Sequence, residues 1–413
     1  MAQFGARLFR SHAKSALEPC LLQRISKERQ VRDRLRSGPH PARAPKMKTC
    51  RAALTAFLFA CSNSPSRNDA VLPEAGAGAP DSGASAPTSE QIWSTSWTKL
   101  PKAPSINGKQ DDVHFVGTIG YSVNGLGEVY RSPDRGDTWE KVLDKPGTYF
   151  RAVNFLDDAT RGFVSNIGPG YYPGVTDDVP LYQTSDSGKT WSPVTAIDGA
   201  MPKGICNFNR VDNTHLFAAG RVGGPSYFLS SSDAGLTWKS KDISGQIAML
   251  VDVHFANDKV GVVTGASSLG GSSKCSILRT EDGGESWSTA FTSKATGEMC
   301  WKISFPSANI GYAAVLTFGN TPSSFIKTVD GGKTWEELPF VDGSYAALGV
   351  GFITDDIGWI GGETEKKPVY RTRDGGKTWE ADGSLGPFIN RFRFVGDRTG
   401  YAIGSTIYRF EVP

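Results

Sequence analysis

The sequence predicts an all-β protein, a seven-bladed β-propeller built from four-stranded antiparallel blades. Three observations predict this fold class. An eight-residue phrase occurs six times, and the residues between its copies alternate between apolar and polar. The C-terminal end of the array is one strand short of a blade, and an isolated strand-like segment stands at its N-terminal end. A repeat period of about 20–50 residues is typical of solenoids and propellers, and repeated four-stranded units favour the propeller.

The repeated phrase reads Ser/Thr-x-Asp-x-Gly-x-Thr/Ser-Trp, and TEDGGESW, TVDGGKTW and TRDGGKTW are its clearest copies. Successive tryptophans of the phrase are 44 to 52 residues apart, which leaves room for four short strands and their turns in each unit. The aspartate and tryptophan of the six copies are Asp134 and Trp139, Asp186 and Trp191, Asp233 and Trp238, Asp282 and Trp287, Asp330 and Trp335, and Asp374 and Trp379.

Each unit contains four predicted strands, because period-two patterning between turn residues is the signature of half-buried strands. A second strand follows a turn and a glycine, a third enters the phrase, and a fourth starts at its tryptophan. The first strands of the six units are expected at 112–116, 152–156, 205–209, 252–256, 302–306 and 349–353.

The seventh blade is predicted to combine the two ends of the chain. After Trp379 come three more strand-like segments, and then the chain stops one strand short of a blade. Residues 94–100 look like an isolated fourth strand, with Trp97 lying 42 residues before Trp139. We therefore expect the N-terminal strand 94–100 to complete the last blade, which would remove the free sheet edges of an open array.

The chemistry of the phrase suits a tight hairpin between the third and fourth strands. Its aspartate can accept hydrogen bonds from turn amides, its glycine allows a positive φ angle, and its tryptophan can anchor the turn on the sheet. No nucleophile, base or metal cage is arranged within it, and six copies cannot all be one active site. We interpret the phrase as structural, with Ca²⁺ binding by the aspartates as the alternative, and we predict no metal and no cofactor.

These residues resemble a known family. The phrase is similar to the Asp-box, or BNR repeat, of sialidases, sortilin-type receptors, some endoglucanases and the photosystem II stability/assembly factors, and the resemblance covers residues 92–413. The assembly-factor branch is the most similar, since 352–362 and 369–380 follow its pattern of Gly-Trp/Tyr strand and T-x-DGG-x-TW. This resemblance implies a propeller that binds protein partners and that is often lipid-anchored or lumenal.

The enzyme branches of the same superfamily need residues that are hard to find here. A sialidase requires an Arg-x-Pro motif in an early strand, and this chain has that motif at Arg43-Ala44-Pro45, upstream of the repeats. Xyloglucanase-type enzymes pair two propellers, whereas this chain has length for one. Asp177 and Asp178 are the best candidates for paired carboxylates, although adjacent acids in a loop more often form a solvated turn. No His/Cys cluster has metal-ligand spacing.

The N-terminal region divides into three predicted segments. Residues 1–46 are strongly basic, with eleven Lys and Arg against three Asp and Glu, which leaves the rest of the chain mildly acidic, so we do not predict nucleic-acid binding by the folded part. Residues 47–61 have a charged start, a short apolar run and a terminal Cys61, the layout of a secretory signal with a lipobox-like end. Residues 62–91 are rich in Ala, Gly, Ser and Pro, which is typical of a flexible linker.

This layout makes Met47 the expected true start and Cys61 the expected lipidation site, and it makes 1–46 an extension that need not be translated. Because Phe59 departs from the usual small residue, secretion without a lipid stays open. For residues 1–46, the alternative is a basic, mostly disordered tail on a cytosolic protein. For the apolar run within 47–61, the alternative is a short buried helix.

Candidate binding residues lie in the loops opposite the Asp-box turns and on the first strands. We expect a binding face that includes Arg151, Tyr171, Tyr172, Arg221, Lys302, Arg391 and Arg393, with the four basic first-strand residues forming a basic channel mouth. Inter-blade packing is the alternative role for each of them. We also expect a disulfide between Cys275 and Cys300, as suits an exported protein, and a buried free thiol at Cys206.

The function predicted from the sequence is an exported, lipid-anchored, non-catalytic module that binds a protein of the cell envelope or assists its assembly. Contact with a membrane is expected through the lipid alone, and the protein is expected to be a monomer. The alternative is a glycan-binding or glycoside-hydrolysing envelope protein of the sialidase-like superfamily.

Overall fold

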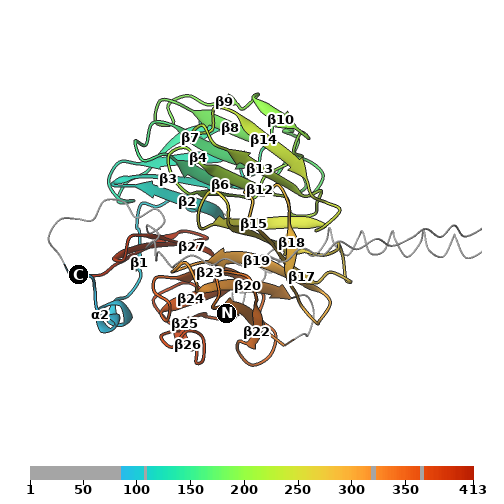
Figure 1. The fold of residues 1–413 in the computed structure, drawn as a ribbon. Helices are drawn as coiled ribbons and strands as arrows, with labels where there is room; N and C mark the ends of the chain where they lie inside the picture. Colours follow the sequence, from blue (N-terminus) through green and yellow to red (C-terminus); the bar gives the residue numbers. More distant parts are fainter. Residues whose placement is uncertain (1–84, 107–108, 318–321, 363–366) are drawn as a thin grey trace, which may run out of the picture. The chain divides into compact units, whose positions relative to one another are not determined.

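The computed structural model describes residues 85–413 except 107–108, 318–321 and 363–366, and within them it confirms a seven-bladed β-propeller (Figure 1). The signal, the lipidation site Cys61 and most of the predicted linker lie outside the described residues. Seven sheets contain the strands of the repeat array in chain order from inner to outer, except that β10 lies at the outer edge of the third sheet and β1 at that of the seventh. The first strands of successive blades contact one another around a closed ring, and the last of them returns to the first.

The first four blades contain the strands of residues 110–242 and 249–292. Their bounds are β2 (Gln110–Val116), β3 (Ile119–Asn124), β4 (Glu128–Ser132) and β5 (Glu140–Asp144); β6 (Phe150–Phe155), β7 (Gly162–Asn166), β8 (Leu181–Thr184) and β9 (Ser192–Pro193); β10 (Ile197–Gly199), β11 (Asn207–Arg210), β12 (Leu216–Gly220), β13 (Tyr227–Ser231) and β14 (Trp238–Asp242); and β15 (Met249–Phe255), β16 (Gly261–Ala266), β17 (Cys275–Thr280) and β18 (Ser288–Thr292).

The last three blades complete the ring. Their bounds are β19 (Glu298–Ser304), β20 (Gly311–Thr317), β21 (Ser324–Thr328) and β22 (Glu336–Pro339); β23 (Ala347–Phe352), β24 (Gly358–Gly362), β25 (Val369–Thr372) and β26 (Glu380–Asp382); and β27 (Ile389–Val395), β28 (Thr399–Gly404), β29 (Ile407–Glu411) and β1 (Thr98–Lys99).

The ring closes as predicted, because β1 pairs antiparallel with β29 and becomes the outer strand of the seventh blade. The predicted strand 94–100 is shorter than expected, and its first residue belongs to a helix, α2 (Ser89–Ser94), which overlaps the end of the predicted linker. Thr88 caps this helix with a capping box, since its side chain accepts a hydrogen bond from the Gln91 N–H while Gln91 accepts one from the Thr88 N–H.

The third blade also departs from the expected four strands. Its fifth strand, β10, pairs in parallel with β14 and extends the outer edge of the sheet. The strand precedes the rest of its blade in the chain, so the alternation signal used to find the other strands could not assign it to this sheet.

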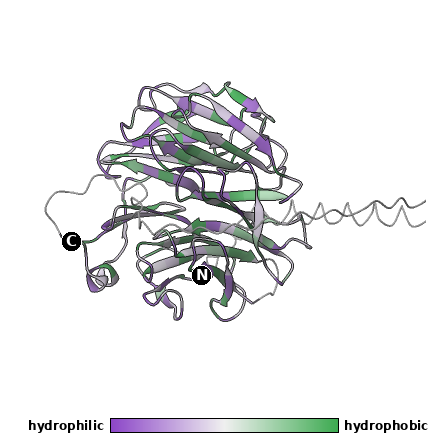
Figure 2. Ribbon diagram, viewed as in Figure 1, coloured by the Kyte–Doolittle hydropathy of each residue, from purple (hydrophilic) through white to green (hydrophobic). Residues whose placement is uncertain are grey.

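A repeated aromatic packing unit joins neighbouring blades. Phe115 of β2 stacks on Tyr401 of the seventh blade with ring centroids 3.8 Å apart, and it meets Trp139 of its own Asp-box edge-on at 6.0 Å. The second-strand residue behind Phe115 is Gly120, where a Cβ would lie 2.2 Å from the ring. Equivalent phenylalanine–glycine pairs recur around the ring, and apolar strands dominate the interior of the sheets (Figure 2). The tryptophans of the repeated phrase are therefore part of the core between blades.

Candidate functional site: the channel and its loop face

The inner strands are irregular near their beginnings, where they line the central channel. Six of the seven lose register with the second strand there, for example between Gln110 and Asp112, between Phe150 and Ala152, and between Cys300 and Ile303. A β-bulge of this kind re-aims side chains from their regular alternation. The residues at or beside these irregularities include Asp111, Asp112, Arg151, Asp252, Lys302 and Arg391.

A buried ion cluster built on Asp112 connects the first and last blades. Arg393 donates to both oxygens of Asp112 at 3.0 and 2.9 Å, and Arg391 Nε lies 3.2 Å from Asp112 Oδ1. Burial raises the pKa of Asp112, but Arg391 and Arg393 outweigh it, so the net pKa lies below its ordinary value. Both arginines also donate to Asn207 Oδ1 at 2.9 Å. The cluster therefore connects three blades across the axis.

A second group of charges lies around Arg151, which is 2% exposed. Its Nη1 donates to Asp111 Oδ1 at 2.6 Å, and its guanidinium lies 5.8 Å from the Tyr149 ring and 5.9 Å from the Trp301 ring. Lys302 is 3% exposed, and burial followed by the charge of Arg391 moves its pKa well below the ordinary value. Arg151 and Lys302 are therefore interior groups, and Arg151 lies beside two aromatic rings.

The structure thus corrects the expectation of an exposed basic mouth. Arg151, Lys302 and Arg391 are buried, and Arg393, whose side chain is 32% exposed, is committed to Asp112. The sequence placed these residues on the inner strands, but it did not reveal that Asp111, Asp112 and Asp252 are positioned to neutralise them. The ion pairs between these basic residues and the acids join different blades and so stabilise the closed ring.

Two of the other predicted binding residues, Tyr171 and Tyr172, lie together on the long loop between β7 and β8. Tyr172 packs on Tyr149 at 4.6 Å and on Tyr171 at 4.7 Å, and both loop tyrosines remain partly exposed. Because Tyr149 also faces Arg151 and directly precedes β6, this tyrosine pair lies beside the start of an inner strand. We call Tyr171 and Tyr172 the tyrosine ridge.

Arg221 supports the tyrosine ridge from below instead of facing solvent. Its Nη1 donates to the backbone carbonyls of Ile167, Pro169 and Lys203 at 3.0, 2.7 and 3.2 Å, and its Nε donates to Gly224 O at 2.8 Å. Arg221 is a predicted binding-face residue that the structure places as a loop clamp. The clamp fixes the start of the loop that carries the ridge.

The six Asp-boxes share one hydrogen-bond pattern. In the fifth, Asp330 Oδ1 accepts from the Thr334 N–H at 3.0 Å and Oδ2 accepts from the Thr334 hydroxyl at 2.6 Å, while the Gly332 N–H donates to Thr328 Oγ1 at 3.0 Å. The residues at the fourth and fifth positions have positive φ in every copy. Both oxygens of each aspartate are committed to donors of its own turn, which explains the phrase without a bound cation.

We expect Asp330→Ala to lower Tm by about 2 °C, in line with the loss of a single capping side chain. Burial raises the pKa of Asp330, but hydrogen bonds from Thr334 and Thr328 bring it down to about 2. Because the folded-state pKa is depressed, the stabilisation is present above the unfolded-state pKa and is lost as the pH falls from about 4 to about 2. Thermal melts against pH would show less acid sensitivity in this variant than in Asp198→Ala, an exposed control.

The carboxylate pair considered for glycoside cleavage is not arranged as a pair. Asp177 accepts hydrogen bonds from Thr148 at 2.6 Å and Tyr182 at 2.7 Å, whereas Asp178 is exposed. Burial raises the pKa of Asp177, but these hydrogen bonds leave it below the ordinary value. A general acid needs a raised pKa, so we assign Asp177 the structural role of holding its loop through the hydrogen bonds from Thr148 and Tyr182. Within the described residues, no group of three or more His, Cys, Asp or Glu side chains could hold a metal ion.

The cysteines of the described residues are arranged as a disulfide and a free thiol. Cys275 of β17 and Cys300 of β19 are joined by a disulfide with a Cα–Cα distance of 4.5 Å, which links the fourth and fifth blades. Cys206 is buried, and its Sγ accepts the Val222 N–H at 3.3 Å.

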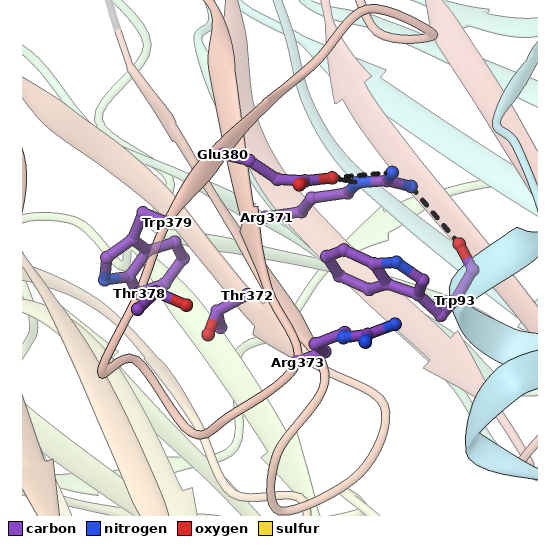
Figure 3. Close-up of a pocket in the computed structure, with 7 residues that line it drawn as sticks. All are labelled: Trp93, Arg371, Thr372, Arg373, Thr378, Trp379 and Glu380. Carbon is purple, nitrogen blue, oxygen red and sulfur yellow. Dashed lines mark hydrogen bonds and ion pairs between the residues drawn. The ribbon is translucent and has the colours of Figure 1, made fainter.

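A shallow pocket of about 220 Å³ lies away from the channel, where α2 meets the sixth blade (Figure 3). Trp93 lies between Arg371, 4.1 Å from its ring centroid, and Arg373, 5.3 Å away. Arg371 also donates to Glu380 at 2.9 Å and to the Trp93 carbonyl at 3.2 Å. The pocket is smaller than common ligand sites of about 300–1,000 Å³, and its side chains attach the helix to the blade.

Comparison with known proteins supports the resemblance found in the sequence. Residues 236–381 match the family described as "Photosynthesis system II assembly factor YCF48". No curated protein matches the sequence significantly. In the part of the chain that the structure describes, no helix is long and apolar enough to cross a membrane.

Several solved structures share the fold. The structure titled "YCF48 bound to D1 peptide" is 20% identical, with a TM-score of 0.56 and coverage of 77% of this chain and 96% of that one. YCF48 from Cyanidioschyzon merolae is 18% identical, with a TM-score of 0.57 and coverage of 76% and 99%. The GH74 enzyme of Niastella koreensis is 15% identical, with a TM-score of 0.52, and this chain covers 53% of it. The chain is thus a seven-bladed propeller that is similar to the photosystem II assembly factor YCF48.

Proposed function

We propose that this propeller is a non-catalytic protein-binding module that assists the assembly of a larger complex. The observation that carries the proposal is the tyrosine ridge, a preformed and partly exposed aromatic pair on the loop between β7 and β8 that packs on Tyr149. The similarity to YCF48, one structure of which is titled as bound to the D1 peptide, supports a protein partner over a glycan.

The ridge has the properties expected of an interface anchor. Tyrosine contributes a large contact area at low conformational-entropy cost, and a few such residues carry most of the energy of an interface. The Arg221 clamp and the Tyr149 ring hold the loop before any partner arrives. Little ordering remains to be done on binding, which favours affinity.

The cellular setting is a second part of the proposal. Residues 47–61 support export with lipidation at Cys61, and the predicted linker 62–91, of which residues 89–91 belong to α2, supports a tether between the lipid and the propeller. Metabolic labelling with an alkyne fatty acid, followed by detection of the labelled protein, tests this setting. Label that persists in Cys61→Ala would disprove lipidation at this residue, whatever the propeller binds.

The binding test is a capture experiment with the full chain on detergent-solubilised membranes of the source cell. We expect Tyr171→Ala plus Tyr172→Ala to weaken binding to the captured partner about 30-fold, the loss of about 2 kcal/mol typical of a hot spot. Tyr130→Ala, in the outer part of the first blade, is the matched control and should bind like the unchanged protein.

Equal capture by the ridge variant and the unchanged protein would place the interface elsewhere. If no protein is captured and the chain is instead retained on a polysaccharide column, the glycan-binding alternative replaces the present proposal. Circular dichroism of each variant would establish that the propeller is folded before binding is compared.

A further inference from the structure

The interior of the channel holds more positive than negative charge. Its basic residues are Arg151, Lys302 and Arg391, which are buried, and Arg393, whose side chain is 32% exposed; the acids that face them are Asp111, Asp112 and Asp252. Lys302 of the fifth blade interacts electrostatically with Arg391, Asp252 and Arg151, which belong to the seventh, fourth and second blades. Lys302 lies in the register irregularity of β19, and its neighbours in the chain reach the same groups, since the Trp301 ring lies 5.9 Å from the Arg151 guanidinium and the Ile303 N–H donates to Asp252.

Several donors in this interior have no acceptor among the described residues. They are Lys302 Nζ and the Nε and Nη2 atoms of Arg151, all with their atoms shielded from solvent. Two of the neighbouring acids are used elsewhere, since Asp252 accepts from Asn207 and from the Ile303 N–H, and Asp112 pairs with Arg391 and Arg393. The third, Asp111, pairs through Oδ1 with both Arg151 and Lys109, while its Oδ2 has no partner among the described residues. Leaving a buried ionised donor unpaired costs free energy, more than for a neutral group.

We propose that the channel binds a small monovalent anion, of the size of chloride, between Lys302 and Arg151. The anion supplies the missing negative charge and accepts hydrogen bonds from Lys302 Nζ and from the unpaired edge of the Arg151 guanidinium. The enclosed position of these atoms favours a compact ion over a polyatomic ligand. Tyr149 and Trp301 flank the guanidinium and keep bulk water away from one side of the site.

This site is separate from the tyrosine ridge, and its role is to complete the interior of the ring. Burial and the charge of Arg391 work against the protonated form of Lys302, and a bound anion reverses that balance. The propeller is then stabilised by anions that fit and not by ionic strength in general, because ligand binding to the folded state stabilises it by mass action.

The experiment compares the full chain in sodium bromide with the chain in sodium gluconate at equal ionic strength. Bromide replaces chloride as a probe, and gluconate is too large to enter. We expect bromide at tenfold its dissociation constant to raise Tm by about 2 °C in the unchanged protein. Lys302→Met should remove this rise, whereas Lys239→Met, at an exposed position of β14, should keep it.

A crystal of the unchanged protein grown in bromide gives a readout that needs no variant. We expect an anomalous peak within hydrogen-bond distance of Lys302 Nζ and Arg151. An ordered water in that place with no anomalous signal would overturn the proposal, as would a bromide-dependent Tm that is the same in Lys302→Met. Neither result depends on whether the tyrosine ridge binds a protein.

Discussion

Asp112→Asn is expected to lower the free energy of unfolding by about 3–5 kcal/mol, because it leaves buried guanidinium groups without their counter-charge. Asp112 is fully buried and is paired with Arg391 and Arg393 of the last blade. Its Oδ2 also accepts the Val153 N–H of the second blade at 3.3 Å. Urea unfolding followed by tryptophan fluorescence measures the change. Asp178→Asn, at an exposed loop position, is the matched control and should change stability by about 0.5 kcal/mol or less.

The same substitution should change the acid response of the protein. The pKa of Asp112 lies below its ordinary value of 3.8 in the fold, so its stabilisation is present above that value and is lost at lower pH. Asp112→Asn should therefore unfold at a urea midpoint that varies less with pH below about 4. A midpoint that follows pH as steeply as in the unchanged protein would show that Asp112 does not carry this charge in the folded state.

Removing the disulfide should have the second-largest effect. Cys275→Ala plus Cys300→Ala is expected to cost about 3 kcal/mol, because the bond closes a loop with a sequence separation of 25 residues and constrains the unfolded chain. The urea midpoint measures the change. Reduction of the unchanged protein in denaturant should move its midpoint to that of the double variant, and the variant itself should not respond to reductant.

A direct check accompanies this prediction. Mass spectrometry of a non-reduced digest should contain the peptide pair that joins 275 to 300. Finding all of the mature-domain cysteines as free thiols, with no stability difference between the two proteins, would contradict the expected bond.

The fold could be predicted because the propeller signal is written many times in the sequence. Each Asp-box contains the residues of its own turn. The isolated strand-like segment around Trp97 predicts that the N-terminal strand closes the last blade, and the pairing of β1 with β29 confirms it. Strand β10 and helix α2 were missed for a physical reason. One pairs in parallel with a strand that comes later in the chain, and the other is too short for periodicity to reveal.

The site could be predicted only in part, because its chemistry depends on contacts between blades. The inner-strand position of Arg391 and Arg393 follows from the repeat, but their pairing with Asp112, at a sequence separation of 281 for Arg393, does not. Period-two patterning also fails at β-bulges, which is where the channel charges lie. A cluster of adjacent acids at the start of the first blade, Asp111-Asp112, was the available signal.

The pairing of β1 with β29 has a consequence for synthesis of the chain. Among the described strands, β1 emerges from the ribosome first and β29 last, so the seventh blade cannot be finished until β29 has been translated. Until then Trp97 lacks the Phe392 and Phe410 rings that it packs against at 5.6 and 5.1 Å. A prematurely terminated product is left with an open ring and an unpaired edge, which is the kind of surface that cellular proteases and chaperones recognise. The ring of the propeller therefore closes only in a translation product that contains both β1 and β29.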